Sequence, residues 1–374
     1  MLPADPPAPI RVMHVISGLG LGGAETMLVN LARAGRAAGL QPHVVSLLPG
    51  GENAERLRAD GIATEDLGMR SGRPSLRAIR RLARAVRRHR PQILQSWMYH
   101  ADLMAWAATR LVPAAERPKL VWGVRCSDMR IDLYRRQLRW VIAACARLSA
   151  RPDMIIANSA AGRDVHRGLG YRNDRFLVIA NGIEAALFRP DPAARAAGRA
   201  ALGLADDAIA VAHVARVDPM KDHATFLAAM AERPDLAGVL VGRGTDALAL
   251  PANVTALGAR NDVAQLLPAF DIVALSSAFG EGFPNALAEG MAAGLVPVAT
   301  DVGDCRDIVG ETGFVARAGD VAGLAEALAA AAAAARAGGG GAARQRILDR
   351  FALPLAVAAF RDAYAGLIAA PCAA

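Results

Sequence analysis

Two series of short, β-rich apolar runs constrain the fold of this chain more than any other feature. The first series occupies residues 12–16, 43–48, 92–95, 120–124, 154–157 and 176–180. The second occupies residues 209–214, 237–241, 253–257, 271–275, 295–299 and 313–316. Stretches with helical character separate the runs in both series, and this alternation predicts βαβ units with parallel sheets. The sequence therefore indicates an α/β protein with two sheets.

The length of the chain indicates more than one domain, because 374 residues exceed what one hydrophobic core usually serves. The segment 181–205 lies between the two series, begins with a turn and contains two prolines, as expected of a connector. We therefore expect domains at residues 1–183 and 184–350. Apolar residues recur at roughly helical spacing after position 351, so residues 351–374 are predicted to form a helix that packs back on the body.

Cysteine usage and hydropathy suggest a compartment. The four cysteines stand far apart without a C-x-x-C pair, so neither a zinc site nor a disulfide framework is indicated. The N-terminal residues lack the basic-then-apolar pattern of a signal peptide, and no run of eighteen apolar residues occurs. We therefore expect a cytoplasmic protein without a membrane-spanning helix.

Positive charge is concentrated in the first half of the chain. Residues 1–180 contain 28 Lys and Arg against 14 Asp and Glu, whereas residues 181–374 contain 15 against 21. The basic half fits an anionic partner such as lipid or nucleic acid, and it also fits a solvated surface. No reader motif or aromatic platform for nucleic acid accompanies the charge, so we expect no nucleic-acid partner.

The segment 75–90 is a dense basic run, SLRAIRRLARAVRRHR. It places arginines around a helix whose remaining face is apolar, with Leu76, Ile79, Leu82 and Val86. A crossover helix with a solvated face explains this pattern. Contact with an anionic membrane surface explains it too, since each surface arginine contributes about 1 kcal/mol there. In the second interpretation the patch extends to Arg135, Arg136, Arg139 and Trp140.

A glycine-rich loop, Gly18-Leu19-Gly20-Leu21-Gly22-Gly23, follows the first predicted strand and precedes a helix. Backbone amides at such a turn can receive a phosphate or the sugar attached to it. The loop also fits a tight turn without a ligand, or an NAD(P)-dependent oxidoreductase. A dehydrogenase places Asp or Glu at the end of the next strand to hold the adenosine ribose, but that strand ends here in Leu47-Leu48-Pro49. The oxidoreductase is therefore the disfavoured alternative.

Two cations, Arg216 and Lys221, follow the first strand of the second series. Ligands of open α/β sheets bind at the carboxyl ends of the strands, so these side chains are candidates to clamp a diphosphate. Charged hydrogen bonds of this kind contribute about 1.5–3 kcal/mol each. The alternative for the pair is a role in surface ion pairs.

Two glutamates, Glu281 and Glu289, frame the segment EGFPNALAE. Pro284 and Asn285 mark a helix N-terminus, whose free amides attract an anion. Glu289 lies about one turn inside this helix, so both carboxylates are expected beside the phosphates. Carboxylates accept hydrogen bonds from vicinal hydroxyls, which indicates contacts to a ribose or a hexose. The alternative is that Glu289 caps or pairs within its own helix.

The segment 281–289 resembles the E-x7-E motif of retaining glycosyltransferases of family 4, which have the GT-B fold of two facing Rossmann-like domains. The resemblance covers most of the chain, because further motifs occur in the same order: the glycine loop, Ser96 to His100, Asn181-Gly182-Ile183, Arg216 with Lys221, Gly242-Arg243-Gly244, and Gly303 through Phe314. Two positions depart from the family pattern. They are Glu184, where the family usually has Asp, and Asp304, where it usually has a second glycine.

The resemblance implies a role for each candidate residue. Arg216 and Lys221 would hold the donor diphosphate, and Glu289 the ribose hydroxyls. Glu281 would contact the transferred sugar together with the backbone amides near Phe283, Pro284 and Asn285. The donor would also contact Gly20, Gly22 and Gly23. His100 matches the active-site histidine of the family, although taken alone it is better explained as a buried histidine with a structural partner.

The implied reaction moves a sugar from a UDP- or GDP-sugar to a hydroxyl of a glycan or polyprenyl-linked acceptor with retention of configuration, in cell-surface polysaccharide or glycolipid synthesis. The nucleotide-sugar is a co-substrate, and no cofactor is expected. The chain contains no D-x-D sequence, so we expect basic side chains and helix amides instead of a metal. The enzyme would be cytoplasmic or peripheral on the inner face of the membrane. A catalytically idle binding protein is the third interpretation.

Overall fold

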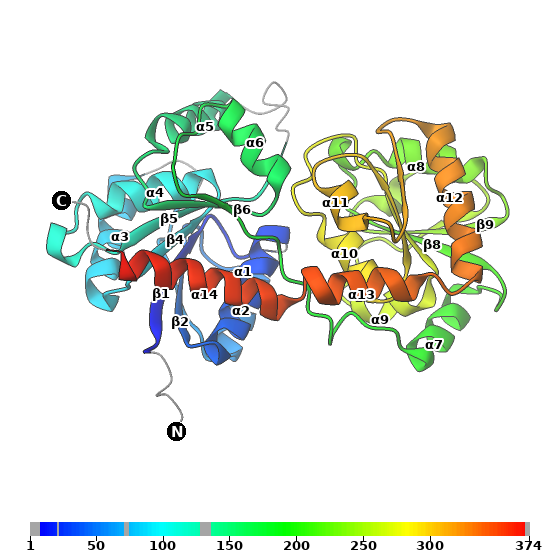
Figure 1. Ribbon diagram of the computed structural model, residues 1–374, viewed down its shortest axis with the longest axis horizontal. Coiled ribbons are helices and arrows are strands. Elements are labelled where there is room, and N and C mark those ends of the chain that lie inside the picture. Colours follow the sequence, from blue (N-terminus) through cyan, green and yellow to red (C-terminus); the bar gives the residue numbers. More distant parts are fainter. Residues whose placement is uncertain (1–7, 21, 71–74, 128–135, 371–374) are drawn as a thin grey trace. The chain divides into compact units, whose positions relative to one another are not determined.

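The computed structural model describes residues 8–20, 22–70, 75–127 and 136–370 of the chain (Figure 1). The chain divides into two compact units. The N-terminal unit comprises residues 1–126, 130–182 and 353–374, and the C-terminal unit comprises residues 127–129 and 183–352. Each unit is described by itself.

The N-terminal unit is built on a seven-stranded sheet with strand order β3-β2-β1-β4-β5-β6-β7. Every neighbouring pair is parallel. The strands are β1 (Ile10–Ile16), β2 (Leu40–Ser46), β3 (Ala63–Asp66), β4 (Ile93–Trp97), β5 (Lys119–Val124), β6 (Met154–Ala157) and β7 (Phe176–Val178). Ile16 pairs with Trp97 in the register of β1 and β4, so the loops that follow these two strands start side by side.

Helices connect the strands of this unit: α1 (Gly23–Ala37), α2 (Glu52–Ala59), α3 (Leu76–His89), α4 (Tyr99–Thr109), α5 (Arg136–Leu148) and α6 (Ala160–Gly168), with a short 3-10 turn η1 (Ala114–Glu116). The last helix of the chain, α14 (Leu353–Ala369), packs against α1 (Figure 1). Phe360 of α14 stacks on Trp97 with ring centroids 6.4 Å apart. Tyr364 donates a hydrogen bond to Gln95 at 3.3 Å, so α14 completes the core beneath β4.

The C-terminal unit is built on a six-stranded parallel sheet with strand order β10-β9-β8-β11-β12-β13. The strands are β8 (Ile209–Val214), β9 (Leu236–Val241), β10 (Val254–Ala256), β11 (Ile272–Leu275), β12 (Val296–Thr300) and β13 (Phe314–Ala316). The helices are α7 (Pro192–Leu202), α8 (His223–Ala231), α9 (Val263–Leu266), α10 (Asn285–Ala292), α11 (Cys305–Val309), α12 (Val321–Arg336) and α13 (Gly340–Arg350), with 3-10 turns η3 (Pro219–Lys221), η4 (Thr245–Ala247) and η5 (Leu267–Ala269). Phe226, Leu240 and Leu328 lie in its buried core.

The predicted α/β class with two parallel sheets is confirmed, two elements were not predicted, and one local expectation is wrong. β3 was not expected, because the sequence ATED has no apolar run and forms a short edge strand. The connector contains α7, because Asp191 caps the Ala193 and Ala194 N–H groups at 3.0 Å and Pro192 occupies the first turn. Leu76 is 70% exposed and does not share the apolar face of α3 with Leu82.

Candidate active site

The loop after β8 positions the two basic candidates. Asp218 begins η3 by accepting a hydrogen bond from the Met220 N–H at 3.0 Å. Asp222 then adopts a left-handed conformation with φ of 45° and caps α8. A non-glycine residue in this conformation costs free energy that surrounding contacts must offset. The chain is thus turned sharply, directly after Lys221.

Ser276, at the end of β11, holds this turn in place. Its buried hydroxyl lies 2.9 Å from the carbonyl oxygen of Lys221 and 3.0 Å from that of Asp222. His213 of β8 contacts the same hydroxyl, and its Nε2 lies 3.1 Å from Ser276 Oγ. Because β8 and β11 are neighbouring strands, the backbone of Lys221 is fixed by the sheet itself.

Lys221 and Glu281 form a buried ion pair. The Lys221 Nζ contacts Glu281 Oε1, and the Ser277 hydroxyl donates to the same oxygen at 2.6 Å. The two charged side chains are 16% and 7% exposed. Removing one partner would leave an uncompensated charge in the interior, which costs about 3–5 kcal/mol. An ammonium group has three donors, so Lys221 keeps hydrogen-bonding capacity for an anion while it is paired.

Gly303 packs closely against the main chain of Glu281. Its φ is 60°, and a Cβ at this position would lie 1.9 Å from the Glu281 carbonyl oxygen. The same carbonyl accepts a hydrogen bond from the Ser127 hydroxyl. A side chain at residue 303 would therefore displace Glu281, which explains why glycine occupies this turn.

Glu289 is the fifth residue of α10, and Pro284 is the N-cap residue of this helix. Its carboxylate is half-buried and has no hydrogen bond or ion pair within the described residues, and burial raises its pKa from the ordinary value to about 7. Glu289 therefore neither caps nor pairs within its helix. A carboxylate desolvated without a protein partner is suited to accept hydrogen bonds from a ligand.

Arg216 is the exposed member of the basic pair. Its side chain is 58% exposed, and its guanidinium lies 3.1 Å from the Asp218 carboxylate. Exposed pairs of this kind contribute about 0–1 kcal/mol. The surface ion pair considered from the sequence is thus present, and it is weak enough for Arg216 to exchange Asp218 for a ligand phosphate.

His100 lies in the first turn of α4, after a second strained residue. Met98 has φ of 72°, and its N–H donates to the Gly123 carbonyl at 2.9 Å. The His100 imidazole is half-buried and has no hydrogen-bond partner among the described residues, and burial lowers its pKa. The ring is therefore neutral near pH 7, with one donor and one acceptor nitrogen available.

The glycine loop precedes α1, and Gly22 takes the N-cap position. The Gly20 carbonyl accepts a hydrogen bond from the Asn53 amide at 2.6 Å. The carboxylate of Glu25 folds back toward the loop, so that a Cβ on Gly22 would lie 2.3 Å from Glu25 Oε2. A negative charge already occupies this helix N-terminus, which favours hydroxyl groups over a phosphate as its ligand.

The candidates fall into two groups, one in each unit. In the C-terminal unit, an ion pair joins Lys221 and Glu281, and Arg216 belongs to the same loop as Lys221. Glu289 lies in α10, and the start of this helix is formed by Phe283, Pro284 and Asn285. In the N-terminal unit, His100, Gly20, Gly22 and Gly23 follow the ends of β4 and β1, which are neighbouring strands. Ser276 and Ser277 hold Lys221 and Glu281 but received no role from the sequence, because a serine after a strand carries no signal of its own.

Comparison with known proteins decides the identity of the fold and the activity. HepE of Anabaena, solved with UDP, superposes with a TM-score of 0.82 over 96% of this chain and 100% of HepE, at 22% identity. A second HepE structure, with UDP-glucose, gives 0.80. The family model described as Glycosyltransferase Family 4 matches residues 21–187, and the model described as Glycosyl transferases group 1 matches residues 208–333. The chain is a glycosyltransferase with the GT-B fold.

Curated relatives of this glycosyltransferase carry the same activity in their names. EpsF of Bacillus subtilis, which is named as a glycosyltransferase, is 26% identical over 308 residues, or 78% of this chain and 79% of EpsF. The D-inositol 3-phosphate glycosyltransferase of Mycobacterium tuberculosis is 33% identical over 172 residues, which are 41% of this chain and 35% of that enzyme. The match to the mycobacterial enzyme therefore spans about a third of its length.

Proposed function

We propose that the enzyme transfers a sugar from a UDP- or GDP-sugar to a hydroxyl of a glycan or polyprenyl-linked acceptor. The observation that carries the proposal is the buried Lys221–Glu281 ion pair, placed directly before the N-terminus of α10. A cation and helix amides suit a diphosphate, and carboxylates suit the hydroxyls of ribose and hexose. The UDP and UDP-glucose bound to HepE support this choice of donor.

Each residue of the C-terminal group then has a distinct role. Lys221 and Arg216 bind the diphosphate, and they stabilise the charge that grows on it as the bond to the sugar breaks. Glu289 accepts hydrogen bonds from the ribose. Glu281 holds Lys221 with one oxygen and accepts a sugar hydroxyl with the other. The Phe283 and Asn285 N–H groups, at the start of α10, donate to the anion, whereas Pro284 has no N–H.

The reaction proceeds with retention of configuration in this proposal. The acceptor oxygen bonds to the anomeric carbon on the face that the phosphate oxygen leaves, and the acceptor proton passes to the departing phosphate. His100 donates a hydrogen bond to the sugar, and the glycine loop contacts hydroxyls. Positive charge comes from side chains and helix amides, so transfer requires no metal. The family resemblance of the E-x7-E segment supports retention.

The acceptor side of the proposal includes an anionic membrane surface. Three arginines on exposed positions of α3 have no ion pair within the described residues, namely Arg77, Arg80 and Arg84. α4 packs against both α3 and α5, and α5 carries Trp140, which is 71% exposed and lines a pocket with Arg136 and Arg139. Arg135 lies outside the described residues. This charge fits a lipid-linked acceptor and a cytoplasmic enzyme on the inner membrane face.

A donor screen tests the proposed function. The unfolding temperature is measured with UDP-, GDP- and ADP-sugars and with NAD and NADP, each with and without EDTA. We expect one nucleotide-sugar class at saturating concentration to raise it by several degrees, because ligand at 100 times its Kd adds about 2.7 kcal/mol of stability. A shift with NAD or NADP alone would favour the oxidoreductase. A nucleotide-sugar shift or a transfer activity that EDTA abolishes and magnesium or manganese restores would refute metal independence.

A further inference from the structure

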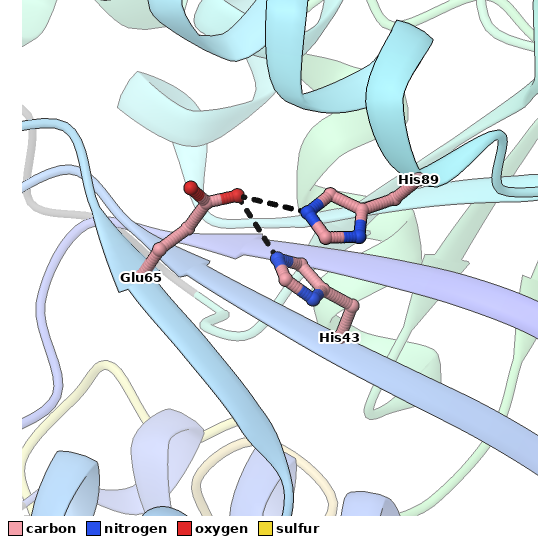
Figure 2. A group of neighbouring side chains, drawn as sticks. All are labelled: His43, Glu65 and His89. Atoms are coloured by element: carbon pink, nitrogen blue, oxygen red, sulfur yellow. Dashed lines mark hydrogen bonds and ion pairs between the residues drawn. The ribbon is translucent and has the colours of Figure 1, made fainter.

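Three side chains outside the proposed donor site converge near one edge of the N-terminal sheet (Figure 2). His43 belongs to β2, Glu65 to the edge strand β3, and His89 is the last residue of α3. Val45 pairs with Glu65 in the register of the two strands, so His43, two residues before Val45, points to the same face as Glu65. One histidine and one glutamate thus meet across two strands, and α3 adds the second histidine.

The ligand atoms of these residues have the spacing of a metal site. Glu65 Oε1 lies 3.0 Å from His43 Nε2 and 3.6 Å from His89 Nε2, and each residue offers one atom such that all three lie within 4.8 Å of one another. Zinc binds nitrogen and oxygen at about 2.0–2.2 Å in tetrahedral geometry, which places neighbouring ligand atoms about 3.3 Å apart. The Glu65–His43 separation of 3.0 Å is slightly shorter than this value, and the Glu65–His89 separation of 3.6 Å is slightly longer.

Figure 2 shows both imidazoles directed at the same carboxylate. The two rings lie 3.9 Å apart between centroids and are tilted by 32°. Two histidines and one carboxylate occupy three corners of a tetrahedron, and water from solvent can take the fourth, since the three side chains are 14%, 31% and 33% exposed. Imidazole nitrogen selects borderline transition ions over magnesium and calcium, which prefer oxygen.

Arg88 contacts the same atoms from the solvent side. Its Nη2 lies 3.0 Å from Glu65 Oε1 and 2.7 Å from Oε2, and its Nε donates to His89 Nε2 at 3.1 Å. The guanidinium thus neutralises the carboxylate at the position where a cation would bind. Its side chain is 58% exposed, so it can swing into water at small cost or keep its hydrogen bond to Oε2 beside a metal.

We propose that His43, Glu65 and His89 bind one divalent transition ion of the zinc class. The ion joins the edge strand β3 to β2 and to the end of α3, and it replaces Arg88 on both Glu65 Oε1 and His89 Nε2. Its role is to stabilise the sheet edge, because β3 is only four residues long and has one neighbouring strand. A nitrogen-rich site of this kind is distinct from the magnesium or manganese that would bridge a diphosphate.

The test uses tag-free, metal-stripped full-length protein and zinc or cobalt alone. We expect one zinc ion per chain by calorimetry and a rise in unfolding temperature on zinc addition. We also expect wild-type protein with cobalt to show the intense visible absorption of tetrahedral cobalt, a measurement that does not depend on any variant. The substitutions H43A, H89A and E65Q should each weaken zinc binding at least tenfold, whereas R88A should strengthen it because its guanidinium competes for the site.

A matched control comes from a second arginine–carboxylate pair at the end of α3. Arg87 lies 3.2 Å from Glu116, and Glu116 belongs to no group of three possible metal ligands among the described residues, so E116Q should leave zinc binding unchanged. Zinc uptake that is equal in wild type, E65Q and the double variant H43A/H89A would overturn the proposal. The absence of both the cobalt spectrum and zinc uptake in wild type would also overturn it, whatever the variants do.

Discussion

Glu289 gives the proposed donor site a pH dependence. Its pKa is raised to about 7 by burial, so it is mainly protonated and neutral at pH 6 and ionised at pH 8. The ionised carboxylate accepts hydrogen bonds from both ribose hydroxyls more strongly than the neutral acid does. If the pKa is 7, the ionised fraction of Glu289 rises about tenfold between these pH values. We therefore expect the donor to bind about tenfold more tightly at pH 8 than at pH 6, measured by calorimetry.

The variant E289Q separates this effect from titration of the nucleotide itself. Glutamine has no proton to lose, so its affinity profile should contain only the nucleotide contribution, and the difference between the two profiles should centre near pH 7. By linkage, bound donor should also lower the pKa of Glu289. If donor affinity depended on pH in the same way for wild type and E289Q, Glu289 would not bind the ribose.

At the level of single residues, the sequence located the charged groups but not their partners. Arg216, Lys221, Glu281 and Glu289 stand out because they follow strand ends and a helix start. That Lys221 pairs with Glu281, 60 residues later, depends on β8 and β11 lying side by side, which no local pattern encodes. The cluster of His43, Glu65 and His89 was missed for the same reason, since its members come from three separate elements.

The proposed membrane contact involves helices α3 and α5. The exposed arginines of α3 and Trp140 of α5 should bring the enzyme to anionic vesicles in a flotation assay, and about 0.5 M salt should release it because the attraction is electrostatic. The triple variant R77E/R80E/R84E should stay in the soluble fraction, and W140A should weaken flotation. Within the described residues no single helix is long and apolar enough to span a membrane. Helices α12 and α13 pass the length and hydropathy test only when taken as a pair, and the chain bends by 96° between them.

A double glutamate substitution at exposed arginines of another helix provides the flotation control. R56E/R58E changes charge on α2, outside α3 and α5, and should leave flotation unaffected. Equal flotation with neutral and anionic vesicles, or unchanged flotation of the α3 variant, would dismiss the membrane surface and leave α3 as a solvated crossover helix.

The type of most elements could be predicted from sequence, and the exceptions have physical causes. Buried parallel strands such as 154–157 and 209–214 are continuous apolar runs, so they matched the observed strands residue for residue. β3 is polar because it lies at the sheet edge, where half of its surface meets water. α7 was hidden because Pro190 and Pro192 suggested a connector, yet proline is favoured in the first turn of a helix.

At the scale of the whole molecule, the sequence predicted two parallel-sheet domains and a glycosyltransferase activity, and both are confirmed. The order of motifs along the chain made this prediction specific, since any single glycine loop also fits other nucleotide-binding folds. The sugar, the nucleotide base and the acceptor could not be predicted, because backbone contacts and pocket shape select them. Side-chain identity carries little of that information.

The central claim is that Glu289 serves donor binding and Glu281 serves turnover. The most direct test measures donor Kd and kcat for E289A and E281Q. We predict that E289A weakens donor binding about tenfold or more with a smaller change in kcat. For E281Q we predict a loss in kcat of about 100-fold with donor Kd within a few-fold of wild type, because Lys221 stays free to bind phosphate. An increase in only the acceptor KM in both variants would contradict the account.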